Sequence, residues 1–386
     1  MGIELVVVDH HEPRASSEGK ENYFIPTATD KDMFMGMVSE YLRMPYDRVF
    51  ADKNPDGSIA SAIYGLSAET RPDITCMRGS LDSASLKRLE RQGVKRVLAL
   101  GWDEVYSTDV SAAERVVVLN PLFSELPSTL CTTHIVYEAV RQFIGSESAD
   151  TALALAAIGI VSDYCTGSAL GLFKEIAYEY PEYFKDVLQL LRKGELDQYS
   201  VFGTRFKELS EMVWAPYILN GSEGSEKMIN AIIDNGTFGV GGMLRGSRNP
   251  AVVYMRGEWE KFQELIEAEW VYFEATAAMD SPFIVYEPRE TKYAGIVQKF
   301  SSMVADKYED SIVMARVPVE GGTKYSIRRR KSDIDLGAML ADMGHSGGHP
   351  EAAGCVVPDA EEFEEEFKKR VRKEMLERFL KSEKKR

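Results

Sequence analysis

Residues 343–355, MGHSGGHPEAAGC, have the side-chain types of a phosphate-binding turn. The adjacent Gly347 and Gly348 have no side chains, so their backbone can approach an anion closely. His345 and His349 stand on either side and can donate hydrogen bonds to it. A tight turn with incidental histidines is the alternative to this interpretation.

A basic run, SIRRR, lies upstream at residues 326–330. If this run is a strand, side-chain alternation sends Arg328 and Arg330 to one face and Arg329 to the other. Arginine forms strong charge-assisted hydrogen bonds with phosphate. We therefore predict that Arg328 and Arg330 bind phosphate or nucleic acid, and a solvated basic strand end is the alternative.

The string HSGGHPEAAG resembles the GGHPxAAG signature of the DHH-associated domain, which ends RecJ-like phosphoesterases, and SIRRR stands at the spacing of that family. The chain thus resembles archaeal RecJ-like proteins of the DHH superfamily. This resemblance implies an N-terminal DHH domain whose carboxylates and histidines hold two divalent metals, commonly manganese. Such metals activate water for attack on a phosphodiester.

The metal-ligand motifs of that family are altered over residues 45–170. The family's His-x-Asp-x-Asp-Gly motif reads DKNPDG here, so Asp52 stands at the histidine and Asn54 at the first aspartate, and only Asp56 and Gly57 match. Gly101 stands where the family has its next aspartate, with Asp103 two positions later.

The family's Asp-His-His position, which follows the strand RVVVL, is taken by Asn120, Pro121 and Leu122. Proline and leucine cannot bind a metal. The final aspartate of the family is present as Asp163. The resemblance therefore leaves Asp52, Asp56 and Asp163 as catalytic remnants and Asp56, Asp163 and Asp103 as the remaining candidate metal ligands, and a tightly bound metal pair is not expected.

A literal Asp9-His10-His11 follows the apolar run ELVVV at the N-terminus. It precedes the other motifs, so it does not fit the chain order of the family. One interpretation is that this strand supplies ligands to Asp56 and Asp163 in a permuted order. The other, which we prefer from the sequence, is a coincidental triplet after an edge strand.

Apolar runs alternate with amphipathic stretches over the first 120 residues, at 4–8, 47–51, 73–77, 96–100 and 115–119. This alternation predicts an α/β fold with a parallel sheet covered on both faces and functional groups at the strand ends. Helical patterns follow from about 132 to 215, including an alanine-rich helix against the sheet.

We predict a DHH domain at 1–215, a turn-rich connector and long helix at 216–281, a smaller α/β DHH-associated domain at 282–357 and a closing helix at 358–386. A Gly- and Asn-rich composition marks the start of the connector.

The chain has 386 residues and a formal net charge of −15. No apolar run is long enough to cross a bilayer, and no secretory leader is evident, so we expect no membrane association and a cytoplasmic location. The acidic balance argues against a wrapping DNA binder, so contact with nucleic acid must be local.

This chain resembles a DHH protein that has kept its fold but lost its metal ligands. The DHH-fold cofactor of the replicative helicase shows the same pattern. The sequence therefore favours a catalytically degenerate scaffold for replication or repair, with no cofactor, weak binding of single-stranded DNA or RNA, and a GINS-type factor or an active paralogue as partner. Aromatic residues between Phe173 and Phe206 are the candidate interface, and the alternative is that they fill the seam between the domains. The rival is an active single-strand exonuclease or nucleotide phosphodiesterase that uses manganese or magnesium in a rearranged site.

Overall fold

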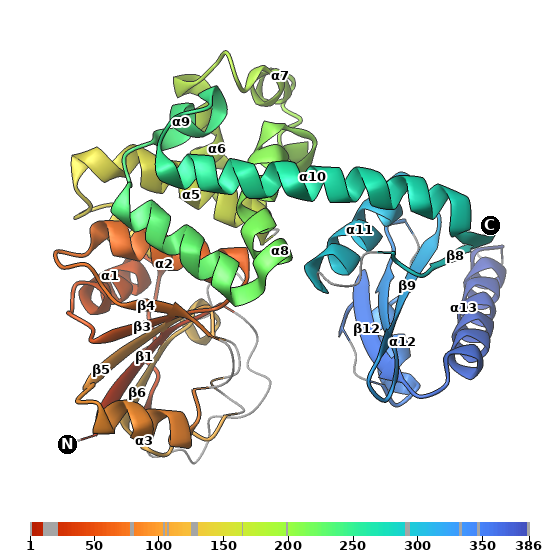
Figure 1. Cartoon of the computed structure of the whole chain (residues 1–386), viewed down its shortest axis with the longest axis horizontal. Coiled ribbons are helices and arrows are strands. Elements are labelled where there is room, and N and C mark those ends of the chain that lie inside the picture. The colour runs from red at the N-terminus through yellow and green to blue at the C-terminus, as the bar shows by residue number, and fades with distance from the viewer. Residues whose placement is uncertain are drawn as a thin grey trace. The chain divides into compact units, whose positions relative to one another are not determined.

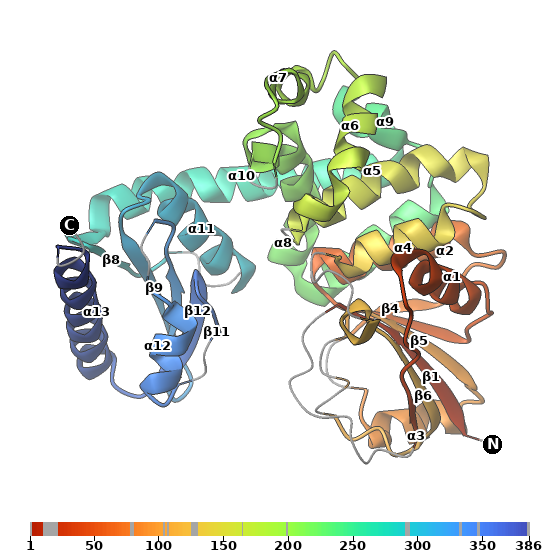
Figure 2. The ribbon, with the colours of Figure 1, turned by 180° about the vertical axis from the view of Figure 1, so that it is seen from behind.

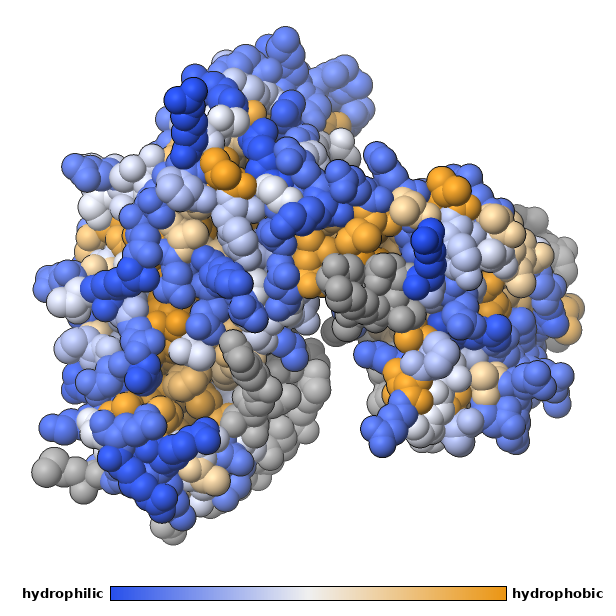
Figure 3. Space-filling model, viewed as in Figure 1, coloured by the Kyte–Doolittle hydropathy of each residue, from blue (hydrophilic) through white to orange (hydrophobic). Residues whose placement is uncertain are grey.

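The computed structural model describes residues 2–10, 22–77, 81–102, 105, 108–124, 130–163, 165–197, 200–289, 294–331, 334–345 and 348–383. The chain divides into two compact units, Met1–Glu260 and Lys261–Arg386 (Figure 1). Helix α10 (Pro250–Thr276) crosses this boundary. No helix in the described ranges is long and apolar enough to span a membrane, and most of the face drawn in Figure 3 is hydrophilic.

The first unit is built on a six-stranded sheet, sheet A, in the order β2-β6-β1-β5-β3-β4. All of its strand pairs are parallel. The predicted α/β fold with a parallel sheet is therefore confirmed. In this spatial order, the strands are β2 (Tyr23–Phe24), β6 (Ala113–Leu119), β1 (Ile3–Val8), β5 (Arg96–Leu100), β3 (Arg48–Ala51) and β4 (Ile74–Cys76).

Strand β1 lies inside the sheet, between β6 and β5. Its side chains alternate between two cores: Val6 and Val8 belong to one, and Leu5 and Val7 to the other. All four are fully buried, because helices cover both faces. The prediction that this strand lies at an edge is wrong.

Helices cover sheet A unequally on its two faces (Figures 1 and 2). One face carries α3 (Ser83–Arg91). The other carries α1 (Lys31–Leu42), α2 (Pro55–Ser67) and α4 (Thr132–Val140). This second layer continues outward into a helical region formed by α5 (Ser146–Ser162), α6 (Leu170–Glu179), α7 (Lys185–Lys193), α8 (Arg205–Asp234) and α9 (Gly239–Arg245).

Two predictions about the helical region need correction. Helix α5 is buried, but it packs mainly on α2, α4, α8 and α9 instead of on the sheet. Residues 216–234, expected to form a turn-rich connector, are part of α8. The backbone of Gly221 is not helical (φ 60, ψ −145), so α8 consists of two helical segments that meet at a kink there, and Pro216 lies in the first segment.

The aromatic residues proposed as an interface mostly fill the core of this region. Phe173, Phe184 and Phe206 are buried, and the rings of Phe184 and Phe206 stack at 4.4 Å. Tyr178 is exposed, and the side chain of Phe202 lies outside the described residues. These aromatics therefore support a packed core and give little support to a partner surface.

The second unit holds sheet B, in the order β11-β12-β10-β9-β8-β7. The β8–β9 pair is parallel and the others are antiparallel. Its elements are β7 (Ala278–Asp280), β8 (Phe283–Tyr286), α11 (Ala294–Lys307), β9 (Ile312–Val319), β10 (Gly322–Arg328), α12 (Leu336–Asp342), β11 (Gly348–His349), β12 (Ala352–Val357) and α13 (Ala360–Glu383).

The closing helix α13 buries an apolar stripe with the four-residue spacing seen in the sequence. Phe363, Phe367 and Val371 are buried against sheet B, whereas Met375 is 41% exposed. The stripe therefore anchors the first half of α13 more firmly than the second.

Candidate metal centre

The carboxyl ends of the central strands of sheet A bring polar residues together. Asp9 follows β1, Asp52 follows β3, Gly101 follows β5 and Asn120 follows β6. Backbone hydrogen bonds continue the strand pairing by one residue: the Asp9 amide donates to Leu119, the Gly101 amide to Val8 and the Asp52 amide to Leu100, at 2.9–3.2 Å. The strand ends are thus held side by side, where parallel sheets place their sites.

His10 lies between two carboxylates that the sequence analysis had singled out. Its Nε2 is 3.1 Å from Asp163 Oδ2, and its Nδ1 is 3.7 Å from Asp56 Oδ2 and 3.1 Å from Thr132 Oγ1. His10 of the N-terminal Asp-His-His segment therefore lies beside Asp56 and Asp163. This is the proximity expected if the N-terminal strand supplies ligands in a permuted order. His11 lies outside the described residues.

The His10 imidazole carries a positive charge when no metal is bound. Burial lowers the pKa of this imidazole. The hydrogen bond with Asp163 and the charges of the surrounding carboxylates, Asp56 first, outweigh burial and raise the pKa from 6.5 to about 10. The metal-free site is thus held together by one imidazolium among acids.

Asp56 is 2% exposed and is fixed by the first turn of α4. Its Oδ2 accepts a hydrogen bond from the Thr132 amide at 3.1 Å, and its Oδ1 accepts one from the Thr133 amide at 2.8 Å. Asn54 caps α2 by accepting from the Gly57 amide at 2.9 Å. Asn54 thus acts as a helix cap, and Asp56 is a carboxylate at a helix N-terminus, where negative charge is favoured.

Asp9 is fully buried and contacts Asn120, which follows β6. The Asn120 side-chain amide donates to Asp9 Oδ2 at 3.5 Å, and Asn120 Oδ1 accepts from the Leu122 amide at 3.0 Å. Pro121 and Leu122 belong to a short 3-10 turn, Pro121–Ser124. Asn120 therefore orients Asp9 and ends the strand.

Gly101 leaves little room for a side chain. Its φ is +77°, and an added Cβ would lie 3.2 Å from Gly57 Cα and 3.4 Å from Asp52 Cβ. The end of β5 therefore packs directly on the start of α2, where a side chain has little room. Asp103 lies outside the described residues.

The residues at this edge fit one divalent cation. One nitrogen of His10 and one oxygen each of Asp56 and Asp163 lie within 4.8 Å of one another. Two carboxylates and an imidazole suit Mn²⁺ or Mg²⁺. Among the described residues Asp52 joins no such group, and its Oδ1 accepts from the Lys53 amide at 2.7 Å.

His134, which lies on α4, is a buried neutral histidine. It is 3% exposed, and its Nδ1 lies 3.1 Å from Ser168 Oγ. Burial, helped by the charge of Lys31, lowers its pKa from 6.5 to about 4. The unfolded chain therefore binds a proton at His134 between these pH values and the folded chain does not.

Acidification from pH 6.5 towards 4 is therefore expected to destabilise the protein through His134, by about 1–3 kcal/mol. Urea unfolding at pH 7 and pH 5 measures this loss. The variant His134→Gln, which can keep a hydrogen bond to Ser168, should lose less stability over the same interval. An identical loss in both proteins would contradict the assignment.

The C-terminal unit places its basic residues on two sides, as alternation predicted. Arg328 Nε donates to Ser302 Oγ at 3.2 Å, and Arg330 Nε donates to Asp306 Oδ1 at 2.5 Å, both on α11. Arg329 Nε instead donates to the Pro350 carbonyl at 2.9 Å. The ion pair with Asp306 offsets part of the charge of Arg330.

The glycine-rich segment forms the short edge strand β11 of sheet B. Gly348 pairs with Ala353 and His349 with Ala352. The His345 ring packs edge-on against Phe363, with centroids 5.3 Å apart. Gly347 and the side chain of His349 lie outside the described residues.

A known domain family matches part of the chain. A family profile described as the DHHA1 domain matches residues 280–377. No curated protein sequence matches the chain significantly. Residues 280–377 are thus a DHHA1 domain, in agreement with the resemblance of the glycine-rich segment.

Solved structures share the fold. RecJ of Thermus thermophilus in complex with Mn²⁺ aligns with a TM-score of 0.55 and 18% identity, over 90% of this chain and 55% of that one. An exonuclease RecJ bound to manganese aligns at 0.51 and 18%, over 90% and 95%. A pGpG-specific phosphodiesterase from Vibrio cholerae aligns at 0.50 and 13%, over 85% and 99%. The chain has a RecJ-like DHH fold and spans about half the length of the Thermus protein.

Proposed function

We propose, from a RecJ-like DHH fold with a C-terminal DHHA1 domain, that this chain is a metal-dependent phosphodiesterase acting on single-stranded nucleic acid or short nucleotides. The observation that carries the proposal is the convergence of His10, Asp56 and Asp163, whose ligand atoms lie within 4.8 Å of one another. The sequence analysis gave this function as the rival interpretation, in which the metal site is rearranged. The order of the motifs in the chain had argued against it.

Each residue of the centre has a distinct part in the proposed reaction. Asp56 and Asp163 supply oxygen ligands and His10 a nitrogen ligand, while Thr132 fixes the orientation of the imidazole through the 3.1 Å contact at Nδ1. Asp9 adds negative charge beside the ligands. A bound Mn²⁺ or Mg²⁺ would supply an activated water and charge stabilisation for phosphodiester hydrolysis.

The DHHA1 domain is proposed to hold the phosphates of the substrate. Arg328 and the β11 backbone at Gly348 and His349 support this role, with His345 and Arg330 nearby in sequence. The contact is expected to be weak and sensitive to salt, because few basic groups take part on an acidic protein.

The rival function, a degenerate scaffold with a GINS-type factor or paralogue as partner, is favoured by a different observation. Gly101 and Asn120 stand at ligand positions of the family, and both have structural roles, in close backbone packing and in orienting Asp9. With Gly101 and Asn120 at these positions, the site offers fewer metal ligands than an active two-metal enzyme has. The partner remains a prediction.

Hydrolysis assays on the full chain separate the two functions. Protein stripped of metal with a chelator should not cleave labelled single-stranded DNA, RNA or dinucleotides, and adding Mn²⁺ should start cleavage of at least one of them. Absence of cleavage with both Mn²⁺ and Mg²⁺ in folded protein would contradict the phosphodiesterase and favour the scaffold.

A further inference from the structure

Two cysteines, Cys131 and Cys165, lie next to Asp163 of the candidate centre. Cys131 precedes the first residue of α4, and Cys165 follows α5 and precedes the 3-10 turn Thr166–Ala169. The two helices cross closely at this point, because Gly159 of α5 faces Thr133: an added Cβ would lie 2.6 Å from the threonine side chain. Packing between α4 and α5 thus brings together two thiols that are distant in sequence.

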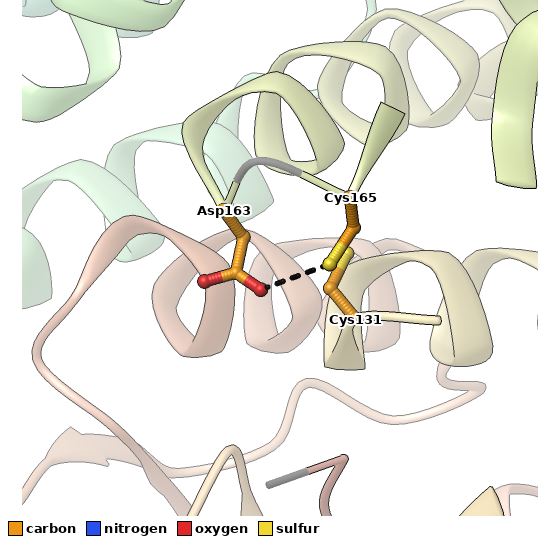
Figure 4. A group of neighbouring side chains, drawn as sticks. All are labelled: Cys131, Asp163 and Cys165. Atoms are coloured by element: carbon orange, nitrogen blue, oxygen red, sulfur yellow. Dashed lines mark hydrogen bonds between the residues drawn. The ribbon is translucent and has the colours of Figure 1, made fainter. Parts of the chain in front are cut away.

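The two sulfurs share a carboxylate with the centre. One oxygen of Asp163 and the Sγ atoms of Cys131 and Cys165 all lie within 4.8 Å of one another, and the Cys165 thiol donates to Asp163 Oδ2 at 3.4 Å (Figure 4). Ligand atoms on one tetrahedral zinc ion lie roughly 3.3–3.8 Å apart, given bond lengths of about 2.0–2.3 Å. Small side-chain rotations would close the group around an ion.

The other cysteines behave as ordinary core residues. Cys76 and Cys355 are buried in strands of different sheets, and neither joins a group of metal-binding side chains among the described residues. Cys165 is only partly buried, and Asp163 is 24% exposed. The group around Asp163 can therefore be reached from solvent.

We propose that Cys131, Cys165 and Asp163 form a separate site for one thiol-preferring divalent ion of the Zn²⁺ class, with its fourth position open to water. Thiolates select zinc over manganese and magnesium, so this site differs in chemistry from the group of His10, Asp56 and Asp163. Asp163 belongs to both groups and is placed to bridge two ions. The inference does not depend on hydrolytic activity.

Cobalt titration of the full chain tests the site directly. The protein is reduced, stripped of metal and titrated with Co²⁺ without oxygen. Thiolate ligation should produce sulfur-to-cobalt charge-transfer bands in the near ultraviolet and visible bands of a tetrahedral ion, and one equivalent of Zn²⁺ should remove both. Binding of Co²⁺ without charge-transfer bands would overturn the proposal.

Variants assign the bands to residues. Cys165→Ser, at the more exposed position, should lose about half of the charge-transfer intensity and weaken Co²⁺ binding at least about tenfold. Cys355→Ala is the matched control and should keep both. Asp56→Asn should also keep the bands, because Asp56 belongs only to the other group. Unchanged bands in Cys165→Ser would overturn the proposal even if the Cys131→Ala protein does not fold.

Discussion

Turnover with Mn²⁺ is expected to fall by at least about 100-fold when His10 is replaced by alanine, since even outer contacts of metal ligands are worth about 10–100-fold. The substitution removes the nitrogen that lies 3.1 Å from Asp163 Oδ2 and the group oriented by Thr132. It also leaves the carboxylates of Asp56 and Asp163 without the cation between them. Initial rates over a range of Mn²⁺ concentrations measure the loss.

A carboxylate at the amino end of a strand, away from the candidate centre, provides the control. Asp73 directly precedes β4 and forms a surface ion pair with Arg48, so Asp73→Asn should leave turnover unchanged. Asp163→Asn should behave like the His10 variant. Thermal unfolding without metal checks that each variant is folded. Wild-type turnover in folded His10→Ala would exclude the N-terminal strand from the centre.

Gly57→Ala is expected to destabilise the first unit by about 1–3 kcal/mol and to displace the neighbouring Asp56. An added Cβ would lie 2.7 Å from Asp52 Cβ and 2.9 Å from the Asp52 nitrogen. Backbone at the end of β3 cannot move away as a flexible side chain could. Urea unfolding at constant pH measures the loss, and Mn²⁺ binding reports the displacement.

Gly36→Ala is the control: it makes the same chemical change but is expected to raise, not lower, the stability of the protein. Gly36 is exposed within α1, and an added Cβ would meet nothing within 4 Å. Gly36→Ala should therefore stabilise the protein by roughly 0.5–1 kcal/mol, because alanine favours the helix. Equal effects of the two substitutions would refute the packing explanation.

Five of the six strands of sheet A could be predicted because they are short apolar runs flanked by polar residues, whereas the two-residue strand β2 was missed. The spatial order of the strands could not be predicted. Residues 5–8 are continuously apolar, which is the pattern of a strand buried on both faces, and β1 is indeed interior. Its position between β5 and β6 depends on pairing with strands about 90 residues or more away, which local pattern does not encode.

The same limit explains what was missed at the centre. Asp56 and Asp163 were found from their motifs, whereas His10 was set aside because its motif comes first in the chain. Parallel strands bring their carboxyl ends to one edge whatever their sequence order, so chain order was a poor guide. The apolar run before Asp9 was the available signal.

The turn-rich connector was expected because glycine and asparagine at 220–224 usually break helices. In the structure Gly224 is needed for close packing: an added Cβ would collide with the Pro216 carbonyl across the kink. The glycines therefore allow two helical halves to approach each other. Composition alone cannot distinguish a glycine that ends a helix from one that lets its backbone pack closely.

The interior position of β1 also has a consequence for synthesis. This strand, apolar except for Glu4, leaves the ribosome first in sheet A, but both of its neighbours follow much later, because β6 is complete only at Leu119. At about 5–20 residues per second, the intervening ~110 residues take on the order of ten seconds. During that time the nascent chain exposes an unpaired strand, a segment that chaperones bind and that aggregates readily. His10 is translated before Asp56 and Asp163, so the group of candidate ligands is incomplete until about 40 residues beyond β6 have been made.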